Sequence, residues 1–273
     1  MIKKGAILIL FLLTGFSCQD YDFNISNLNN NEISVLGHGG MGIGHVYPMN
    51  TYESIMNCLN LGADGTEIDV QITKDSVLVA YHDKLLQHST DKSGKIYQHN
   101  WKEIKDANYK NPPYVNYKIR SLNEIFSNIP DLHNYLYFID YKNYNPDTSS
   151  IFDNIFIKSL EEIIVKHQLQ NNIYVGLKDI KLIASLREQK PNLNIFIYAG
   201  FENANIIAKK YNLQGITIDV DEISADQVKK AHANEIMIAV YNAHSKESNI
   251  EAVEKNVDFI QSGKIKHLLK ILN

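Results

Sequence analysis

Short apolar runs and amphipathic stretches alternate along most of this 273-residue chain, and no other feature limits its fold as strongly. From Ile33 onward, each run with the two-residue period of a strand is followed by a helical pattern or an insertion. Strands are expected at 33–36, 66–72, 135–142, 173–177, 195–199, 216–220, 237–241 and 257–261. Strands that alternate with helices pair in parallel, and eight such units close a barrel. The predicted fold class is α/β, a TIM (β/α)8 barrel over residues 33–273.

The connections between these strands follow the same plan. A helix is expected to begin near Asn50, where Glu53 completes a capping-box pattern, and to end at Gly62. Other helical patterns lie at 101–107, 121–126, 179–189, 202–210, 224–233, 246–255 and 264–272. The irregular stretch of about residues 84–118 is too long for a plain connection. We interpret it as a small insertion after the second strand that covers the mouth of a site.

The second strand carries two carboxylates on one face. Glu67 and Asp69 are two residues apart, so their side chains point to the same side of a strand. Taken alone, a Glu-x-Asp pair is typical of a solvated strand end. Buried side by side, the two anions would need a positive partner, and an all-oxygen pair suits Mg²⁺ or Ca²⁺ better than zinc.

Further polar residues follow other strand ends. A hairpin whose turn is 74–76 and whose second strand is 77–81 would bring His82 and Asp83 back toward the carboxylates. The C-terminal ends of barrel strands meet at one mouth. The barrel therefore gathers His38, Glu67, Asp69, Asp140 and Lys142. The other histidines are interpreted as structural or surface residues, namely His45, His88, His99, His133, His167, His232, His244 and His267.

The N-terminus has the order of an export signal. Lys3 and Lys4 precede an apolar run that is too short to span a bilayer, and residues 15–18 resemble a lipobox that ends at Cys18. We predict a lipoprotein-type signal peptide at 1–17, a polar tether at 18–32, and an exported protein anchored in the bacterial cell envelope through lipid on Cys18. A simple cleaved signal is the alternative.

The overall charge limits the partners. The net charge is −4 with an isoelectric point near 6.2, so no basic field would attract a polynucleotide. We expect a small-molecule substrate and no nucleic acid. The sequence does not set the oligomeric state.

A set of motifs before residue 143 resembles the glycerophosphodiester phosphodiesterases. The motifs are His38-Gly39-Gly40, Pro48-Met49-Asn50-Thr51, Glu67-Ile68-Asp69-Val70, His82-Asp83 and Asp140-Tyr141-Lys142. The resemblance implies a TIM barrel with one divalent cation that hydrolyses glycerophosphodiesters to sn-glycerol 3-phosphate and an alcohol. It further implies metal ligands at Glu67, Asp69 and Asp140, general acid and base at His38 and His82, and a phosphate contact at Lys142.

Two positions depart from the family pattern in ways that bear on the substrate. Gly39 stands where the family usually has an Arg that grips phosphate, and Met49 replaces a usual Glu. Asp140 stands where Glu is more usual, although related phospholipases of the same barrel also use Asp. Three readings follow: a glycerophosphodiesterase, a phospholipase acting on intact lipid, or a degenerate binding lipoprotein. The choice of Mg²⁺ or Ca²⁺, the head group, the division of roles between the histidines, and water or a substrate hydroxyl as nucleophile stay open.

Overall fold

Eight parallel strands form a closed barrel in the computed structural model, which describes residues 21–43, 47–146 and 150–273. The strands are β1 (Ser34–Gly37), β2 (Gly65–Ile72), β5 (Leu136–Tyr141), β6 (Ile173–Leu177), β7 (Asn194–Tyr198), β8 (Gly215–Asp219), β9 (Met237–Ala243) and β10 (Phe259–Ser262). Strand β1 pairs with both β10 and β2, which closes the ring. The predicted TIM barrel is confirmed, and the predicted strands lie within two residues of the observed ones.

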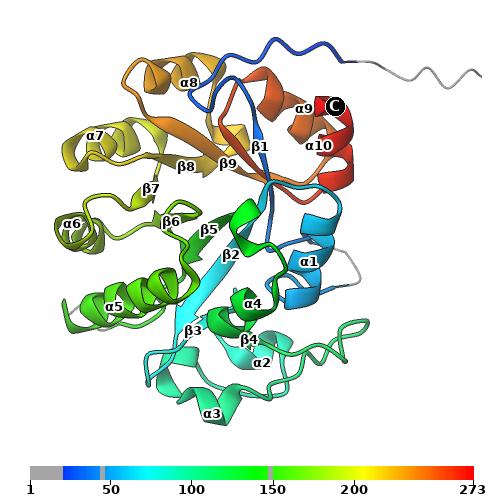
Figure 1. The fold of residues 1–273 in the computed structure, drawn as a ribbon, viewed down its shortest axis with the longest axis vertical. Coiled ribbons are helices and arrows are strands. Elements are labelled where there is room, and N and C mark those ends of the chain that lie inside the picture. The colour runs from blue at the N-terminus through cyan, green and yellow to red at the C-terminus, as the bar shows by residue number, and fades with distance from the viewer. Residues whose placement is uncertain (1–20, 44–46, 147–149) are drawn as a thin grey trace, which may run out of the picture.

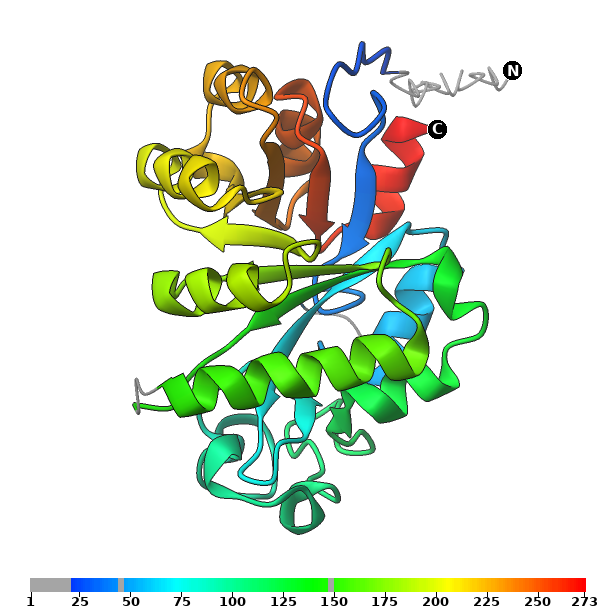
Figure 2. The ribbon, with the colours of Figure 1, turned by 60° about the vertical axis from the view of Figure 1, so that its left-hand side comes forward.

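Helices surround the strands on the outside, as Figures 1 and 2 show. They are α1 (Tyr52–Asn60), α4 (Leu122–Asn128), α5 (Ser150–His167), α6 (Ile180–Gln189), α7 (Phe201–Tyr211), α8 (Ala225–His232), α9 (Lys246–Glu254) and α10 (Ile265–Leu272). Their apolar faces and the outward side chains of the strands make the main core. A smaller apolar cluster fills the barrel interior and includes Leu36, Phe138, Phe196 and Phe259. Because these apolar side chains occupy the interior, the polar side chains that point inward lie at the C-terminal ends of the strands, which form the mouth.

The insertion has a small core of its own. Strand β3 (Leu78–Ala80) pairs antiparallel with β2 and with β4 (Arg120–Ser121), which confirms the predicted hairpin. Between β3 and β4 lie α2 (Leu86–Ser89), the 3₁₀ helix η1 (Ile96–Gln98) and α3 (Trp101–Ile104). Buried residues of these elements pack together, among them Val79, Tyr81, Leu86, Ile96, Ile104 and Tyr109. The insertion is thereby packed as one unit and joined to β2 through β3.

Two local features differ from the sequence interpretation. No helix was predicted between the third and fourth strands, where α5 runs for 18 residues. Ile151 and Val165 of this helix are exposed, so the apolar residues do not mark one face clearly. The N-cap of α1 is Thr51, whose hydroxyl accepts a hydrogen bond from Ser54 N–H, and it is not Asn50. Asn50 instead points to the second strand.

The described part of the expected tether, residues 21–32, is attached to the barrel. Tyr21, Phe23 and Ile25 pack on the main core, and the Leu28 N–H donates to Asp258 Oδ1 at 2.8 Å. The alternating apolar residues pack on the barrel, and asparagine side chains form hydrogen bonds with the backbone. These contacts attach the polar stretch to the fold. It lies at the opposite end of the molecule from the insertion (Figures 1 and 2). Within the part of the chain that the structure describes, no helix could span a membrane.

Candidate active site

Three carboxylates meet at the mouth because two neighbouring strands are in register. Asp69 of β2 lies directly beside Asp140 of β5, and Glu67 precedes Asp69 on the same face. One oxygen from each of the three carboxylates lies within 4.8 Å of the other two. Glu67 and Asp69 are 1% exposed and Asp140 is 6% exposed. The structure thus brings together the three predicted metal ligands in a buried cluster.

Burial and mutual repulsion disturb the ionisation of this cluster. Burial, with the charges of Asp69 and Asp140, raises the pKa of Glu67 well above its usual value. Burial, with the charge of Asp69, also raises the pKa of Asp140, although Lys142 opposes it. For Asp69, Lys142 and the other partners outweigh burial, and the pKa is lowered. The positive charge of Lys142 is therefore too small to stabilise all three carboxylates in the ionised form.

Lys142 supplies the positive charge that the cluster does have. Its Nζ lies 2.6 Å from Asp140 Oδ2 and 3.0 Å from Asp69 Oδ1. Burial alone would lower the pKa of the ammonium, but the three carboxylates raise it. Lys142 is thus a fixed cation at the mouth, and it is the residue for which the resemblance predicts a phosphate contact.

The cluster fits a hard divalent cation. Oε2 of Glu67 accepts a hydrogen bond from the Gly39 N–H at 2.8 Å, whereas the buried Oε1 has no hydrogen-bond partner. Asn50 holds Asp69 from two sides: its Nδ2 donates to Oδ2 at 2.7 Å, and its Oδ1 accepts from the Asp69 N–H at 2.8 Å. Oriented carboxylate oxygens with one unsatisfied atom are the ligand type of Mg²⁺ or Ca²⁺.

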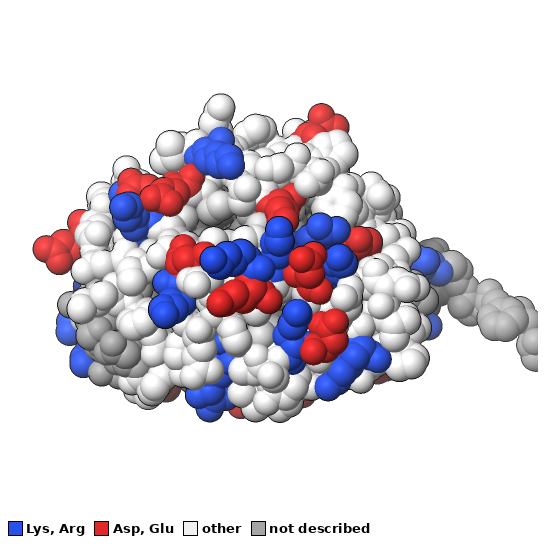
Figure 3. Space-filling view, turned by 90° about the horizontal axis from the view of Figure 1, so that it is seen from below, with Lys and Arg blue, Asp and Glu red and all other residues white. Residues whose placement is uncertain are grey.

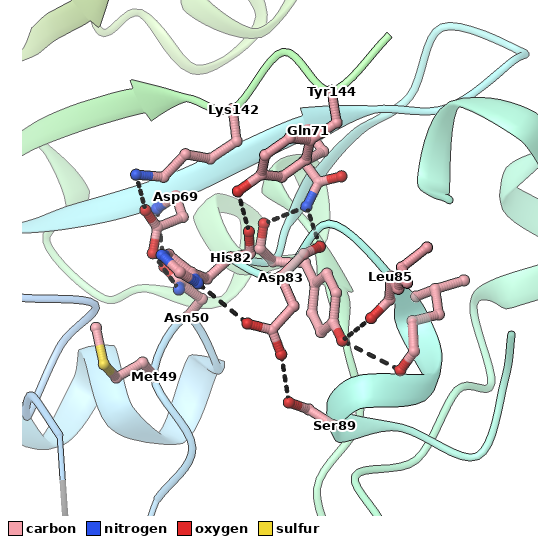
Figure 4. A network of polar contacts seen from close by, with 12 residues as sticks. Met49, Asn50, Asp69, Gln71, His82, Asp83, Leu85, Ser89, Lys142 and Tyr144 are labelled. Carbon is pink, nitrogen blue, oxygen red and sulfur yellow. Dashed lines mark hydrogen bonds and ion pairs between the residues drawn. The ribbon is translucent and has the colours of Figure 1, made fainter. Parts of the chain in front are cut away.

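His82 follows β3 and lies on the insertion side of the mouth. Its Nδ1 is 3.1 Å from Asp83 Oδ1, and this hydrogen bond raises the pKa of the imidazole although burial opposes it. The backbone around it is fixed: Tyr144 donates to the His82 carbonyl at 3.1 Å, and Gln71 donates to the Asp83 carbonyl at 2.9 Å. Figure 4 shows this network beside Asp69 and Lys142.

His38 directly follows β1, and its pKa is shifted in the opposite direction to that of His82. Burial lowers the pKa of its imidazole to about 4, and its buried Nδ1 has no hydrogen-bond partner. Its ring stacks on that of His244, with centroids 5.1 Å apart and planes 11° apart. His244 in turn packs over Gly263, where a Cβ would lie 2.8 Å from His244 Nδ1. The mouth thus holds a neutral imidazole as well as a readily protonated one.

The sequence interpretation missed two residues of this site. His244 was grouped with structural or surface histidines, yet it directly follows β9 and stacks on His38. A position just after a barrel strand was the available signal, but the strand was expected to end at Tyr241. Asn50 was interpreted as a helix N-terminus and as part of the Pro48-Met49-Asn50-Thr51 motif, but no role in the site was assigned to it. Among the other histidines, His232 lies away from the mouth, and its Nε2 is 2.8 Å from Asp258 Oδ2. His45 lies outside the described residues.

Gly39 and Met49 depart from the family pattern together, and they touch. Gly39 has φ of +55°, and a Cβ at this position would lie 2.8 Å from both Cβ and Cε of Met49. A side chain at residue 39 would therefore strain the backbone and collide with Met49. Met49 thus covers the glycine.

Comparison with known proteins identifies the family. A sequence model of the glycerophosphoryl diester phosphodiesterase family matches residues 41–265. The chain belongs to this family. The matched range contains Glu67, Asp69, His82, Asp140 and Lys142, while His38 lies just before it. As the motifs predicted, the protein is a glycerophosphodiester phosphodiesterase, a phosphoric diester hydrolase.

Individual relatives cover most of the chain. Glycerophosphodiester phosphodiesterase 1 of Rattus norvegicus is 24% identical over 248 residues, which span 78% of this chain and 72% of the relative. The Bacillus altitudinis glycerophosphodiester phosphodiesterase is 24% identical over 227 residues, spanning 78% and 88%. The structure of an Oleispira antarctica phosphodiesterase in complex with the product sn-glycerol-3-phosphate matches with a TM-score of 0.78 and 17% identity, covering 90% of this chain and 99% of the other. This structural likeness shows the shared barrel.

Proposed function

We propose that the protein hydrolyses glycerophosphodiesters to sn-glycerol 3-phosphate and an alcohol, with one divalent cation held by Glu67, Asp69 and Asp140. The observation that carries this proposal is the convergence of a buried carboxylate cluster, a lysine and two imidazoles with different pKa shifts at one barrel mouth. The family match supports the same reaction class. Because all of these side chains are present in the described site, a degenerate binding protein is the less supported reading.

The two histidines divide the proton transfers. The bound cation would neutralise charge on the phosphoryl oxygens. Lys142 adds a second positive charge at the same place. His38, whose lowered pKa keeps it neutral near pH 7, accepts the proton of the attacking oxygen as that oxygen bonds to phosphorus. His82, whose pKa is raised by Asp83, gives its proton to the alcohol oxygen as the other P–O bond breaks. If water attacks, this one step gives glycerol 3-phosphate. If a substrate hydroxyl attacks, the first product is a cyclic phosphate, and water must then open the ring to give glycerol 3-phosphate.

The surface supports a small substrate. On the face seen in Figure 3, Lys and Arg are interspersed with Asp and Glu, and no area of one sign dominates. Mixed charge of this kind does not attract a polyanion such as nucleic acid.

Product release tests the proposal. The protein with Mg²⁺ or Ca²⁺ is incubated with glycerophosphocholine, with glycerophosphoethanolamine, and with intact phosphatidylcholine, and glycerol 3-phosphate and phosphorylated head groups are measured. The proposal predicts glycerol 3-phosphate from a glycerophosphodiester and its loss in Asp69→Asn. Cleavage of the intact lipid alone would instead support a phospholipase. No cleavage of any phosphodiester would support a binding protein.

We also propose that the protein is exported and anchored through Cys18. The sequence of residues 1–18 supports this, and these residues lie outside the described part of the structure. The attached segment 21–32 supports it too, because it lies at the end of the barrel opposite the insertion. Cys18→Ser should release the protein into the soluble fraction or leave the signal uncleaved. Unchanged processing and membrane retention would contradict lipidation.

A further inference from the structure

A second lysine lies at the barrel mouth on the strand next to that of Lys142. Lys142 directly follows β5 and Lys178 directly follows β6, and these two strands pair with Asp140 opposite Gly176. The same register, continued by two residues, sets the two lysines side by side, one strand spacing or about 4.8 Å apart at the backbone. Of the residues that directly follow the barrel strands, only these two are Lys or Arg. The strand ends thus carry two permanent positive charges, and Lys142 accounts for only one.

Lys178 points into the mouth. Tyr174 of β6 packs against the apolar cluster of the barrel interior, and residues two apart share a face, so Gly176 and Lys178 point the same way. Gly176 leaves room for the Tyr198 ring of β7, since a Cβ at residue 176 would be 2.3 Å from Tyr198 Cε2. The Lys178 Nζ lies over that ring, 5.7 Å from its centroid. An aromatic face therefore supports the ammonium at the mouth.

The charge of Lys178 reaches the carboxylate cluster. Burial raises the pKa of Asp140, and Lys142 and, less strongly, Lys178 oppose this shift. Burial, together with the charges of the three carboxylates of the cluster, raises the pKa of Tyr198 well above its usual value. The ring that supports the Lys178 ammonium is thus close to the same carboxylates. Lys142 already reaches Asp140 Oδ2 from the equivalent position of the neighbouring strand, at 2.6 Å, so a lysine at residue 178 has the length to reach a ligand bound there.

The two lysines differ in what offsets their charge. Lys142 bridges Asp69 and Asp140, so two carboxylates already neutralise it. Lys178 is exposed and forms no ion pair with any described residue. The adjacent carboxylate, Asp179, instead accepts hydrogen bonds from backbone N–H groups at the start of α6. The Lys178 ammonium is therefore the strand-end cation that can take an anionic group of a ligand.

We propose that Lys178 is a further substrate-binding residue, whose ammonium donates a hydrogen bond to a phosphoryl oxygen of the substrate bound at the carboxylate cluster. The inference rests on the proposed function and adds a second protein cation to its phosphate site. The phosphomonoester product has one more anionic oxygen than the diester, so the contact is measured most directly on sn-glycerol 3-phosphate.

Binding of the product tests this contact without turnover. The affinities of sn-glycerol 3-phosphate and of inorganic phosphate are measured separately by calorimetry, with saturating Mg²⁺ or Ca²⁺. Lys178→Met should weaken both at least about tenfold, the loss expected for one charge-assisted hydrogen bond, and Lys178→Arg should keep most of the affinity. Lys181→Met is the matched control, because it removes the same charge from α6, where Lys181 lies near Asp153 of α5. It should leave both affinities unchanged.

A metal titration separates substrate binding from an effect on the cluster. Lys178 is not a metal ligand and its charge repels a cation, so Lys178→Met should bind Mg²⁺ or Ca²⁺ at least as tightly as the wild type. A loss of metal affinity in parallel with the loss of phosphate affinity would show that Lys178 acts through the cluster, and it would overturn the assignment.

The possible failures are distinguishable. If a glycerophosphodiester is cleaved but Lys178→Met binds both anions like the wild type, or if Lys181→Met loses as much affinity, the assignment of Lys178 is wrong while the proposed function stands. A loss for glycerol 3-phosphate without a loss for inorganic phosphate would place the contact on the glycerol and would also overturn it. If no glycerophosphodiester is cleaved but phosphate binding depends on Lys178, the anion contact stands and the proposed function is wrong.

Discussion

Replacing His38 by Gln should remove a large part of the acid sensitivity of the protein in chelator. The pKa of His38 is about 4 in the fold because of burial, against an ordinary value of 6.5. The unfolded chain therefore binds more protons than the folded one between these values, and stability falls as the pH drops from 7 to 4. At about 1.4 kcal/mol per pKa unit, this one residue costs up to about 3 kcal/mol at pH 4.

Thermal unfolding at several pH values measures this effect. In a chain of this size, 1 kcal/mol shifts Tm by roughly 2–4 °C, so the wild type should lose roughly 6–12 °C more than His38→Gln between pH 7 and pH 4. The carboxylates titrate in both proteins, and the difference between the two curves isolates His38. Parallel curves would show that His38 is not held neutral by burial, and the assignment of His38 as the base would lose its support.

Three other substitutions test the site. Glu67→Gln should abolish tight binding of Mg²⁺ or Ca²⁺ in calorimetry, yet raise Tm in chelator at pH 8, because the raised pKa of Glu67 means that its ionisation opposes folding as the pH rises; a lower Tm would contradict this. Asn50→Ala should weaken metal affinity by about 10–100-fold through the loss of the bonds that orient Asp69, and unchanged affinity would refute that role. His244→Ala should lower kcat more than His244→Phe, which keeps a ring against His38; equal losses in kcat would indicate that the stack does not position His38.

The barrel and the metal cluster could be predicted because both follow from strand periodicity. Alternation within the strand at 66–72 assigns Glu67 and Asp69 to one face, and parallel strands bring their C-terminal ends to one mouth. Asp140 could be added to the cluster on the same grounds, and the register between β2 and β5 confirms it. These inferences needed only local patterns and a general rule of the fold.

Other contacts depend on the exact path of loops, which periodicity does not determine. His244 reaches His38 because β9 continues to Ala243 and because Gly263 leaves room for its ring. Asn50 reaches Asp69 because its backbone has φ of +64°, which turns its side chain toward the barrel. Helix α5 was missed for a different reason, since its apolar residues surround the helix and give little periodicity.

On the proposed mechanism, phosphodiester cleavage requires a cation bound by Glu67, Asp69 and Asp140. This requirement is tested most directly by titrating Mg²⁺ or Ca²⁺ into chelator-treated protein while glycerol 3-phosphate release from a glycerophosphodiester is followed. We expect no release in chelator and a rate that rises with the occupancy of a single site, with both responses absent in Asp69→Asn. Release at the same rate in excess chelator, or an undiminished response in Asp69→Asn, would contradict it.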